Sequence, residues 1–168
     1  MSKAVLISIR PKWCELIANG TKTVEVRKSR PKLHTPFKCY IYCTLPKYPH
    51  EDFIATDYPM PQFYGGGKVI GEFTCERIAL IAYDGGELSS TTNAAFSPAT
   101  CLTQSEIIAY IGDKGRCYGW HMSNLRIYDT PRELSEFTGL RDTRFGAAPY
   151  DIKRAPQSWC YVEAMDNG

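Results

Sequence analysis

The chain has 168 residues, of which 43% are hydrophobic and 23% are charged. This composition supports a packed core and argues against a disordered chain. No uncharged apolar run approaches the roughly 18–20 residues that cross a bilayer. The apolar stretch at residues 4–9 is too short for a signal peptide. We therefore expect a soluble, cytoplasmic protein with no membrane contact.

The formal net charge of +2 hides an asymmetry. Residues 1–48 contain ten Lys or Arg and two acidic residues, a net charge of +8, and the other 120 residues have a net charge of −6. A basic first third indicates a positive face that favours an anionic partner. An ordinary solvated surface rich in lysine would have the same charge, so charge alone leaves both interpretations open.

The first elements along the chain are a strand, a helix and a second strand. Residues 3–9 predict a buried strand, and Pro11 begins a helix at the position where its missing N–H matters least. An i, i+3, i+4 apolar stripe continues this helix, and Gly20 ends it as the C′ residue. The alternation over residues 21–27 predicts a strand with one functional face, although its start can also be a loop.

In the middle of the chain, predicted strands alternate with two segments that have a loop-like composition. Residues 37–45 predict a strand, and residues 46–67, rich in Pro, Tyr and Gly, are long enough for a functional loop or an insertion. Residues 68–83 predict another strand. Residues 84–99 form the second segment of loop-like composition, rich in Gly, Ser, Thr and Asn.

Two capping boxes mark the remaining helices. Residues 103–106 (Thr-Gln-Ser-Glu) precede an apolar helix, and residues 130–133 (Thr-Pro-Arg-Glu) precede a second short one. Strands are predicted at residues 117–128 and 158–163. About six strands with two or three short helices predict an α+β fold, a small β-barrel with flanking short helices.

The seven cysteines are odd in number, irregularly spaced and without a C-x-x-C pair. In a cytoplasmic chain this pattern predicts reduced, buried thiols rather than disulfides. Three histidines are too few to favour a metal site with them. We expect no metal and no other cofactor.

Residues 7–27 are the most informative segment, because a strand, a Pro-started helix and a glycine precede K-T-x-E-x-R. This segment resembles the ASCH domain family, whose signature is G-x-K-x-x-E-x-R after the first helix. Gly20, Lys22, Glu25 and Arg27 match that signature. Residues 67–72 (GKVIGE), 118–120 (YGW) and 155–161 (APQSWCY) agree with it.

The resemblance covers nearly the whole chain, as a single ASCH/PUA-like domain over residues 1–168 with loop insertions at 46–66 and 84–100. It implies a PUA-like β-barrel with a cleft lined by the motif. It also implies RNA, or a nucleoside or nucleotide, as the ligand.

The chemistry of the motif residues agrees with that ligand class. The planar fork of Arg27 suits a phosphate or a base edge. Glu25 shares the parity of Arg27, so it can hold Arg27 in place or accept a proton from an exocyclic amine. Lys22, if partly desolvated, has a lowered pKa and can act as a base or stabilise charge. The alternative is a structural Lys–Glu–Arg network between strands.

The resemblance leaves catalysis open. Some small bacterial ASCH proteins look like amidohydrolases that act on N4-acetylcytidine, and others are regarded as ribonucleases. The amidohydrolase motif is G-x-K-T-x-T, with a catalytic lysine and second threonine, plus a distant glutamate. Lys22 and Thr23 match it, whereas Glu25 occupies the second threonine position. Lys22 and Glu25 are thus the candidate catalytic residues, and Glu72 and Glu106 are candidates for the distant acid.

Aromatic side chains can stack on an unpaired base, each worth about 1–3 kcal/mol. The stacking candidates include Tyr118 and Tyr161, whereas the helical spacing of Trp13 predicts a core position. The candidate ligand-binding set is Arg10, Lys12, Lys22, Thr23, Glu25, Arg27, Lys28, Arg30, Tyr64, Trp120, Ser158 and Trp159.

Three classes of function follow from these observations. The first is a module that binds RNA or a nucleotide, and the second is a hydrolase acting on an acylated nucleoside or an RNA phosphodiester. The third is a protein-interaction module that uses the two insertions as its contact surface. Oligomeric state is not predicted by the sequence.

Overall fold

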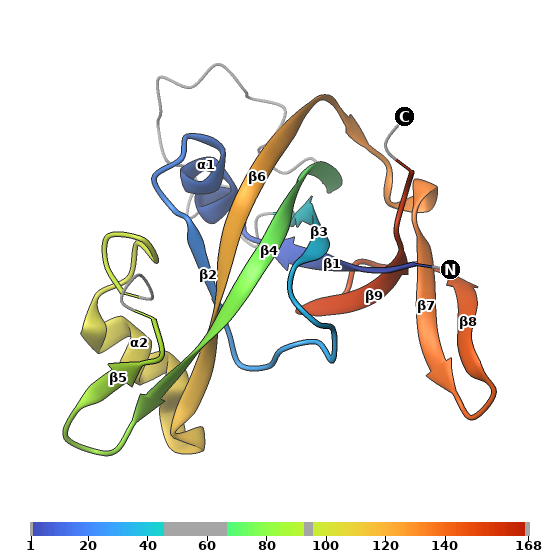
Figure 1. The fold of residues 1–168 in the computed structure, drawn as a ribbon. Helices are drawn as coiled ribbons and strands as arrows, with labels where there is room; N and C mark the ends of the chain where they lie inside the picture. The colour runs from blue at the N-terminus through green and yellow to red at the C-terminus, as the bar shows by residue number, and fades with distance from the viewer. Residues whose placement is uncertain (1, 46–66, 93–95, 167–168) are drawn as a thin grey trace. The chain divides into compact units, whose positions relative to one another are not determined.

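The computed structural model describes residues 2–45, 67–92 and 96–166 (Figure 1). The chain divides into two compact units. Unit 1 comprises Met1–Glu15, Lys38–Phe73 and Leu125–Gly168, and unit 2 comprises Leu16–Phe37 and Thr74–Asn124. Four elements contribute residues to both units: helix α1 (Pro11–Ala18), strand β3 (Phe37–Cys43), strand β4 (Lys68–Tyr83) and strand β6 (Arg116–Arg132).

Unit 1 is built on a sheet whose strands follow the order β6-β4-β3-β1-β9-β7-β8. Its further strands are β1 (Lys3–Ile9), β3 (Phe37–Cys43), β7 (Thr138–Thr143), β8 (Gly146–Asp151) and β9 (Trp159–Glu163). Strand β1 pairs in parallel with β3 and antiparallel with β9, and β7 and β8 form an antiparallel pair (Figure 1). The 3-10 helix η4 (Leu134–Glu136) lies between β6 and β7.

Unit 2 has the strand order β2-β6-β4, with β5 paired to β4. Its own elements are β2 (Val24–Arg27), β5 (Leu88–Ser90), α2 (Gln104–Ile111) and the 3-10 helix η3 (Gly112–Lys114). Strand β2 pairs antiparallel with β6, so that Glu25 lies opposite Trp120 and Arg27 lies opposite Tyr118. This register positions the candidate site.

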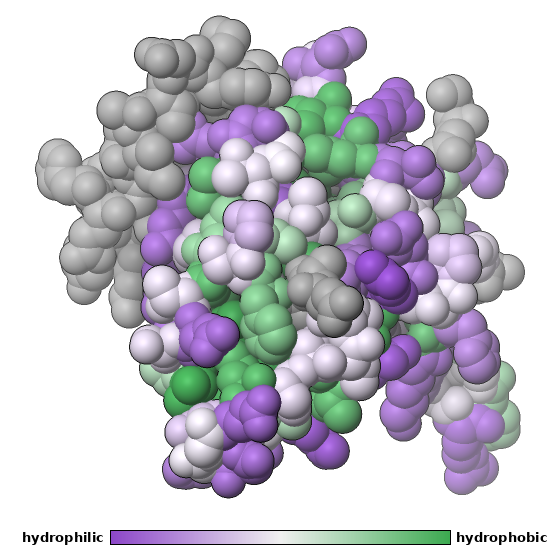
Figure 2. Space-filling model, turned by 60° about the vertical axis from the view of Figure 1, so that its left-hand side comes forward, coloured by the Kyte–Doolittle hydropathy of each residue, from purple (hydrophilic) through white to green (hydrophobic). Residues whose placement is uncertain are grey.

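Each unit has an apolar cluster of its own. The cluster of unit 1 consists of Ala4, Leu6, Tyr40, Val69, Tyr128, Phe137 and Val162. The cluster of unit 2 consists of Val26, Ala79, Ile81, Ile107, Ile111 and Cys117. Ile107 and Ile111 are four residues apart on α2, so one face of this helix packs on the sheet. On the face in Figure 2, hydrophilic residues (purple) are interspersed with apolar ones (green).

Several predicted elements are confirmed. Strand β1 spans residues 3–9 as predicted, and α1 begins at Pro11. Gly20 follows α1 with a positive φ of 82°, a conformation that favours glycine. The capping box at α2 is present, with Thr103 as N-cap. The hydroxyl of Thr103 accepts a hydrogen bond from the N–H of Glu106, and the Glu106 carboxylate accepts one from the N–H of Thr103.

Other predictions require correction. The second capping box is formed by Glu133 and Glu136 around η4 rather than by residues 130–133, because residues 130–132 continue strand β6. The estimate of about six strands was too low, since β5, β7 and β8 were not predicted. All seven cysteines are free; five are buried, whereas Cys101 and Cys160 are half-buried.

The described part of the chain is mostly β-sheet with two α-helices. Among the described residues, neither unit has a strand order that closes on itself, so the closed barrel stays a prediction. The single-domain assignment also stays a prediction. The expected insertion at 46–66 lies outside the described residues, and the one at 84–100 contains β5. Within the described part of the chain, no helix is long and apolar enough to cross a membrane.

Candidate nucleic-acid interface

Lys22 lies buried at the entrance to β2. Its side chain is only 2% exposed, and its Nζ donates a hydrogen bond of 2.5 Å to the carbonyl oxygen of Thr100. The same segment covers the outer edge of β2, because the N–H groups of Thr23 and Val24 both donate to the Ala99 carbonyl, at 2.9 and 3.0 Å. The hydrogen bond from Lys22 therefore helps to hold the segment that precedes α2 against β2.

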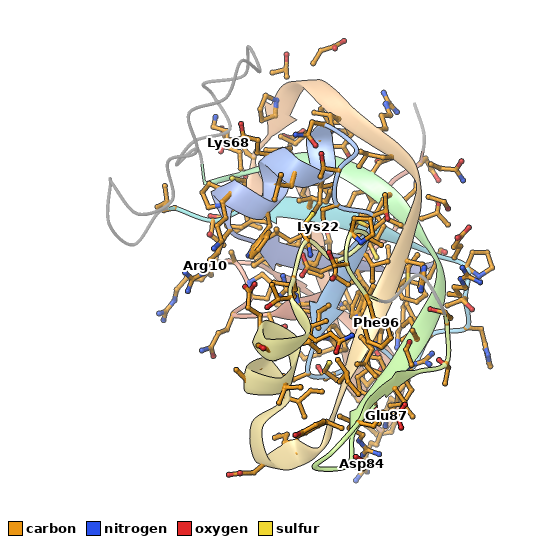
Figure 3. The ribbon with its side chains drawn as sticks, turned by 90° about the vertical axis from the view of Figure 1, so that its left-hand side faces the viewer. Arg10, Lys22, Lys68, Asp84, Glu87 and Phe96 are labelled. Carbon is orange, nitrogen blue, oxygen red and sulfur yellow. The ribbon has the colours of Figure 1, made fainter. Side chains whose placement is uncertain are left out.

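Burial lowers the pKa of Lys22, because an apolar surrounding disfavours the charged ammonium. Arg27 acts in the same direction, whereas Glu25 and Cys101 favour the charged form and oppose it. The sequence indicated a lowered pKa for Lys22 on the condition that its side chain is desolvated, and its burial meets that condition. Figure 3 labels buried Lys22 and half-buried Phe96, and it shows Asp84 and Glu87 at the turn between β4 and β5.

Glu25 and Arg27 form an ion pair two residues apart on β2. Glu25 is 6% exposed, and its Oε1 lies 3.8 Å from Nε of Arg27. The same oxygen accepts a hydrogen bond of 3.0 Å from the N–H of Val26. The second oxygen, Oε2, is buried and has no hydrogen-bond partner among the described residues. The structure thus brings Lys22, Glu25 and Arg27 together in unit 2.

Trp120 does not supply the stacking surface expected of it. It is 0% exposed, and its ring meets that of Phe37 edge-on, with the centroids 5.9 Å apart. A base cannot stack on a ring that is wholly enclosed, so Trp120 is a core residue. Its place opposite Glu25 on β6 still makes it part of the support beneath the candidate site.

Lys28 and Arg30 line a hollow of about 770 Å³ in unit 2. Two further cations complete its rim, Lys114 from η3 and Arg116 from the start of β6, and Tyr118 contributes an aromatic ring. Neither Lys114 nor Arg116 was among the residues predicted from the sequence for the site. The only local signal was their position on either side of Gly115, in a basic turn.

The remaining candidates belong to unit 1. Arg10 is exposed, and Nζ of Lys12 lies 4.4 Å from the ring centroid of Trp13. The carbonyl of Ser158 accepts a hydrogen bond from the N–H of Ser8, and the half-buried ring of Trp159 meets Tyr161 edge-on at 5.4 Å. Trp13 is half-buried rather than a full core residue. Tyr64 lies outside the described residues.

The two candidates for a distant acid have other partners. Glu106 completes the capping box of α2. Glu72, in unit 1, accepts hydrogen bonds from Nζ of Lys38 at 3.1 Å and from the hydroxyl of Tyr128 at 2.6 Å. Burial alone raises the pKa of Glu72, but these two hydrogen bonds and the charges of Lys38 and Arg126 together outweigh it, so the pKa is lowered.

No group of three or more His, Cys, Asp or Glu side chains is arranged to hold a metal ion within the described ranges. The donors that the candidate interface offers are ammonium and guanidinium groups. Such groups bind anions rather than metal ions. The arrangement can therefore recognise phosphate or a polar base edge.

The comparisons with known proteins support the resemblance to the ASCH domain family over the segment that carries the motif. The family model described as "ASCH domain" matches residues 7–42, which include the whole G-x-K-x-x-E-x-R element. The resemblance predicted from the motif is thereby confirmed. No curated protein matches the chain.

Solved ASCH structures from Zymomonas mobilis share the fold. The crystal structure of ASCH from this organism is 18% identical, with a TM-score of 0.60, over 95% of this chain and 87% of that chain. A serine-to-alanine mutant of that protein is also 18% identical, with a TM-score of 0.60, over 95% of this chain and 88% of that chain. A tyrosine-to-phenylalanine mutant is 17% identical, with a TM-score of 0.54, over 96% of this chain and 91% of that chain. Such identities show a common fold.

Proposed function

We propose that this protein binds RNA or a nucleotide, with Lys22, Glu25 and Arg27 of unit 2 at the centre of the site. The observation that carries the proposal is the unpartnered, buried Oε2 of Glu25 beside two cationic side chains. A buried acceptor without a partner costs about 1–3 kcal/mol, and more for a charged group. A ligand that donates an N–H to this oxygen removes that penalty on binding.

A nucleobase and its phosphate supply what this arrangement lacks. The exocyclic amine of a base is an N–H donor suited to Glu25 Oε2. The guanidinium of Arg27 provides the planar fork that binds phosphate in a bidentate manner. The basic character of residues 1–48 then favours the approach of a polyanion. We also propose that the chain forms a closed PUA-like β-barrel, as a single domain with two loop insertions.

The test measures binding of a short fluorescein-labelled single-stranded RNA by fluorescence anisotropy. Arg27→Lys retains the charge but loses the planar fork, so we expect it to weaken binding by about tenfold or more. Arg77→Lys is the matched control, because Arg77 is an exposed arginine of the same unit. Equal affinities of these two variants would contradict the role of Arg27.

A second pair of variants tests the carboxylate. Glu25→Gln removes an acceptor of charge-assisted hydrogen bonds, and Glu76→Gln is its exposed counterpart in unit 2. The expected loss for Glu25→Gln, about 1.5–3 kcal/mol, corresponds to about 10- to 150-fold in affinity. Thermal melts confirm first that both variants are folded at the temperature of the binding assay.

The second candidate function is hydrolysis of an acylated nucleoside such as N4-acetylcytidine. The lowered pKa of Lys22 favours this candidate, because it increases the fraction of neutral amine that can act as a base. Lys22 would take a proton from water, which attacks the amide carbonyl and releases acetate and the free amine. Chromatography of the nucleoside measures turnover. Full turnover by Lys22→Met would exclude Lys22 as the base.

A further inference from the structure

The hollow in unit 2 carries four cationic side chains from two segments of the chain that are distant in sequence. Lys28 and Arg30 follow β2, Lys114 ends η3, and Arg116 begins β6. All four side chains are exposed to solvent. No carboxylate is among the described residues that line the hollow. Four like charges around one concavity create a positive potential that concentrates anions.

Three acidic residues of unit 2, Asp84, Glu87 and Asp113, belong to the turns at this end of β4 and β6 but do not line the hollow. Asp84 lies in the turn after β4, where its carboxylate accepts hydrogen bonds from the N–H groups of Gly86 and Glu87 at 2.9 and 2.7 Å. Glu87 is exposed at the same turn (Figure 3), and Asp113 is exposed within η3. None of these three side chains lines the hollow.

The lining of the hollow is suited to more than a simple ion. Leu80, Ala82 and Tyr118 line it together with the cations, so part of the lining is apolar and aromatic. An aromatic ring in such a lining can stack on a base or contact a ribose. The volume of about 770 Å³ lies within the range of roughly 300–1,000 Å³ that is usual for ligand sites.

The strand register connects the hollow to the proposed site. Tyr118 of β6 lies directly opposite Arg27 of β2, and side chains at such a pair project from the same face of the sheet. Lys28 follows Arg27 along the chain, and its ammonium lies 5.1 Å from the ring centroid of Tyr110. Arg27 is thus next to Lys28 in the chain and opposite Tyr118 across the strand pair, and both of these residues line the hollow.

We infer that this hollow is a second anion-binding site, which holds the phosphodiester backbone of an RNA strand whose base is bound at Glu25 and Arg27. This inference rests on the proposed function. Its chemical content is specific: phosphates contact Lys28, Arg30, Lys114 and Arg116, and sequence discrimination lies elsewhere, because phosphate contacts carry no base information.

The experiment measures the salt dependence of RNA binding by anisotropy. Lys114→Gln/Arg116→Gln removes two cations from the hollow, and Lys28→Gln/Arg30→Gln removes the other two. Lys153→Gln/Arg154→Gln is the control, because it makes the same charge change at exposed residues of unit 1. Each hollow variant should reduce the magnitude of the log–log salt slope by about 1.4, since each phosphate contact on a single strand contributes about 0.7.

The outcomes separate this inference from the proposed function. For a hollow variant, the loss of affinity between about 50 and 200 mM salt should become about sevenfold smaller than for the wild type. A hollow variant that behaves like the control, while Arg27→Lys still weakens binding, overturns the inference and leaves the proposed function standing. Failure of the wild-type protein to bind RNA at low salt overturns both.

Discussion

Replacing Glu25 with glutamine should lower the free energy of unfolding by about 2–3 kcal/mol. The change removes the charge but retains an amide oxygen that can accept the hydrogen bond from the N–H of Val26. Arg27 and Lys22 then lose their nearby negative charge. At 3.8 Å and an effective dielectric constant of about 20, the attraction between Glu25 and Arg27 is about 4 kcal/mol.

Two effects reduce this value. The Arg27 side chain is 13% exposed, so water takes over part of its solvation. Glu25→Gln also replaces a buried carboxylate, whose Oε2 has no hydrogen-bond partner, with a neutral amide. Burial of an amide costs less free energy than burial of a carboxylate, so part of the lost stability is recovered. Breaking a buried ion pair typically costs about 3–5 kcal/mol, and these two effects place Glu25→Gln at or below the low end.

Urea unfolding followed by circular dichroism at neutral pH measures the change. The midpoint should fall while the m-value stays the same, and the melting temperature should drop by about 5–10 °C. Glu76→Gln, an exposed carboxylate of the same unit, should change stability by less than about 0.5 kcal/mol. If Glu25→Gln is as stable as this control, the electrostatic reasoning about the site is refuted.

Three further predictions concern pH, packing and capping. Burial lowers the pKa of Lys22 below its ordinary value of 10.5, so between the two pKa values the unfolded state binds a proton that the folded state has released. Stability should therefore rise as pH increases towards 10.5, and Lys22→Met should flatten that rise in urea titrations from about pH 8 to 10. A Cβ at Gly71 would lie 2.5 Å from the carbonyl oxygen of Arg126, so Gly71→Ala should destabilise by about 2–3 kcal/mol in thermal melts, whereas Gly86→Ala, with its nearest atom at 3.7 Å, should be nearly neutral. Thr103→Ala removes the N-cap of α2 and should lower the free energy of unfolding by about 1 kcal/mol; an unchanged urea midpoint would contradict the capping role.

Local patterns in the sequence were enough for the elements with strong periodicity or clear boundaries. Strand β1 is a continuous apolar run, α1 begins at a proline and is followed by Gly20, and α2 carries its own capping box. These signals act over a few neighbouring residues, so they are readable without knowledge of the fold. The motif residues Lys22, Glu25 and Arg27 were found in the same way, because they lie on one short segment.

Strands β7 and β8 gave no such signal, for a physical reason. Their residues are mostly small, charged or exposed, and the pairing depends on Tyr150 of β8 lying over Gly139 of β7. A Cβ at Gly139 would come within 2.3 Å of that ring. This contact joins two residues that have no common local pattern, so it exists only once the strands are paired.

The candidate site shows the same division between local and tertiary information. The sequence was sufficient to identify a Lys–Glu–Arg motif with the chemistry to bind phosphate and a base edge. It could not show that Trp120 is enclosed by Phe37, because burial depends on what the folded chain places over a side chain. Nor could it place Lys114 and Arg116 beside Lys28, since the antiparallel register of β2 and β6 creates that proximity between distant segments.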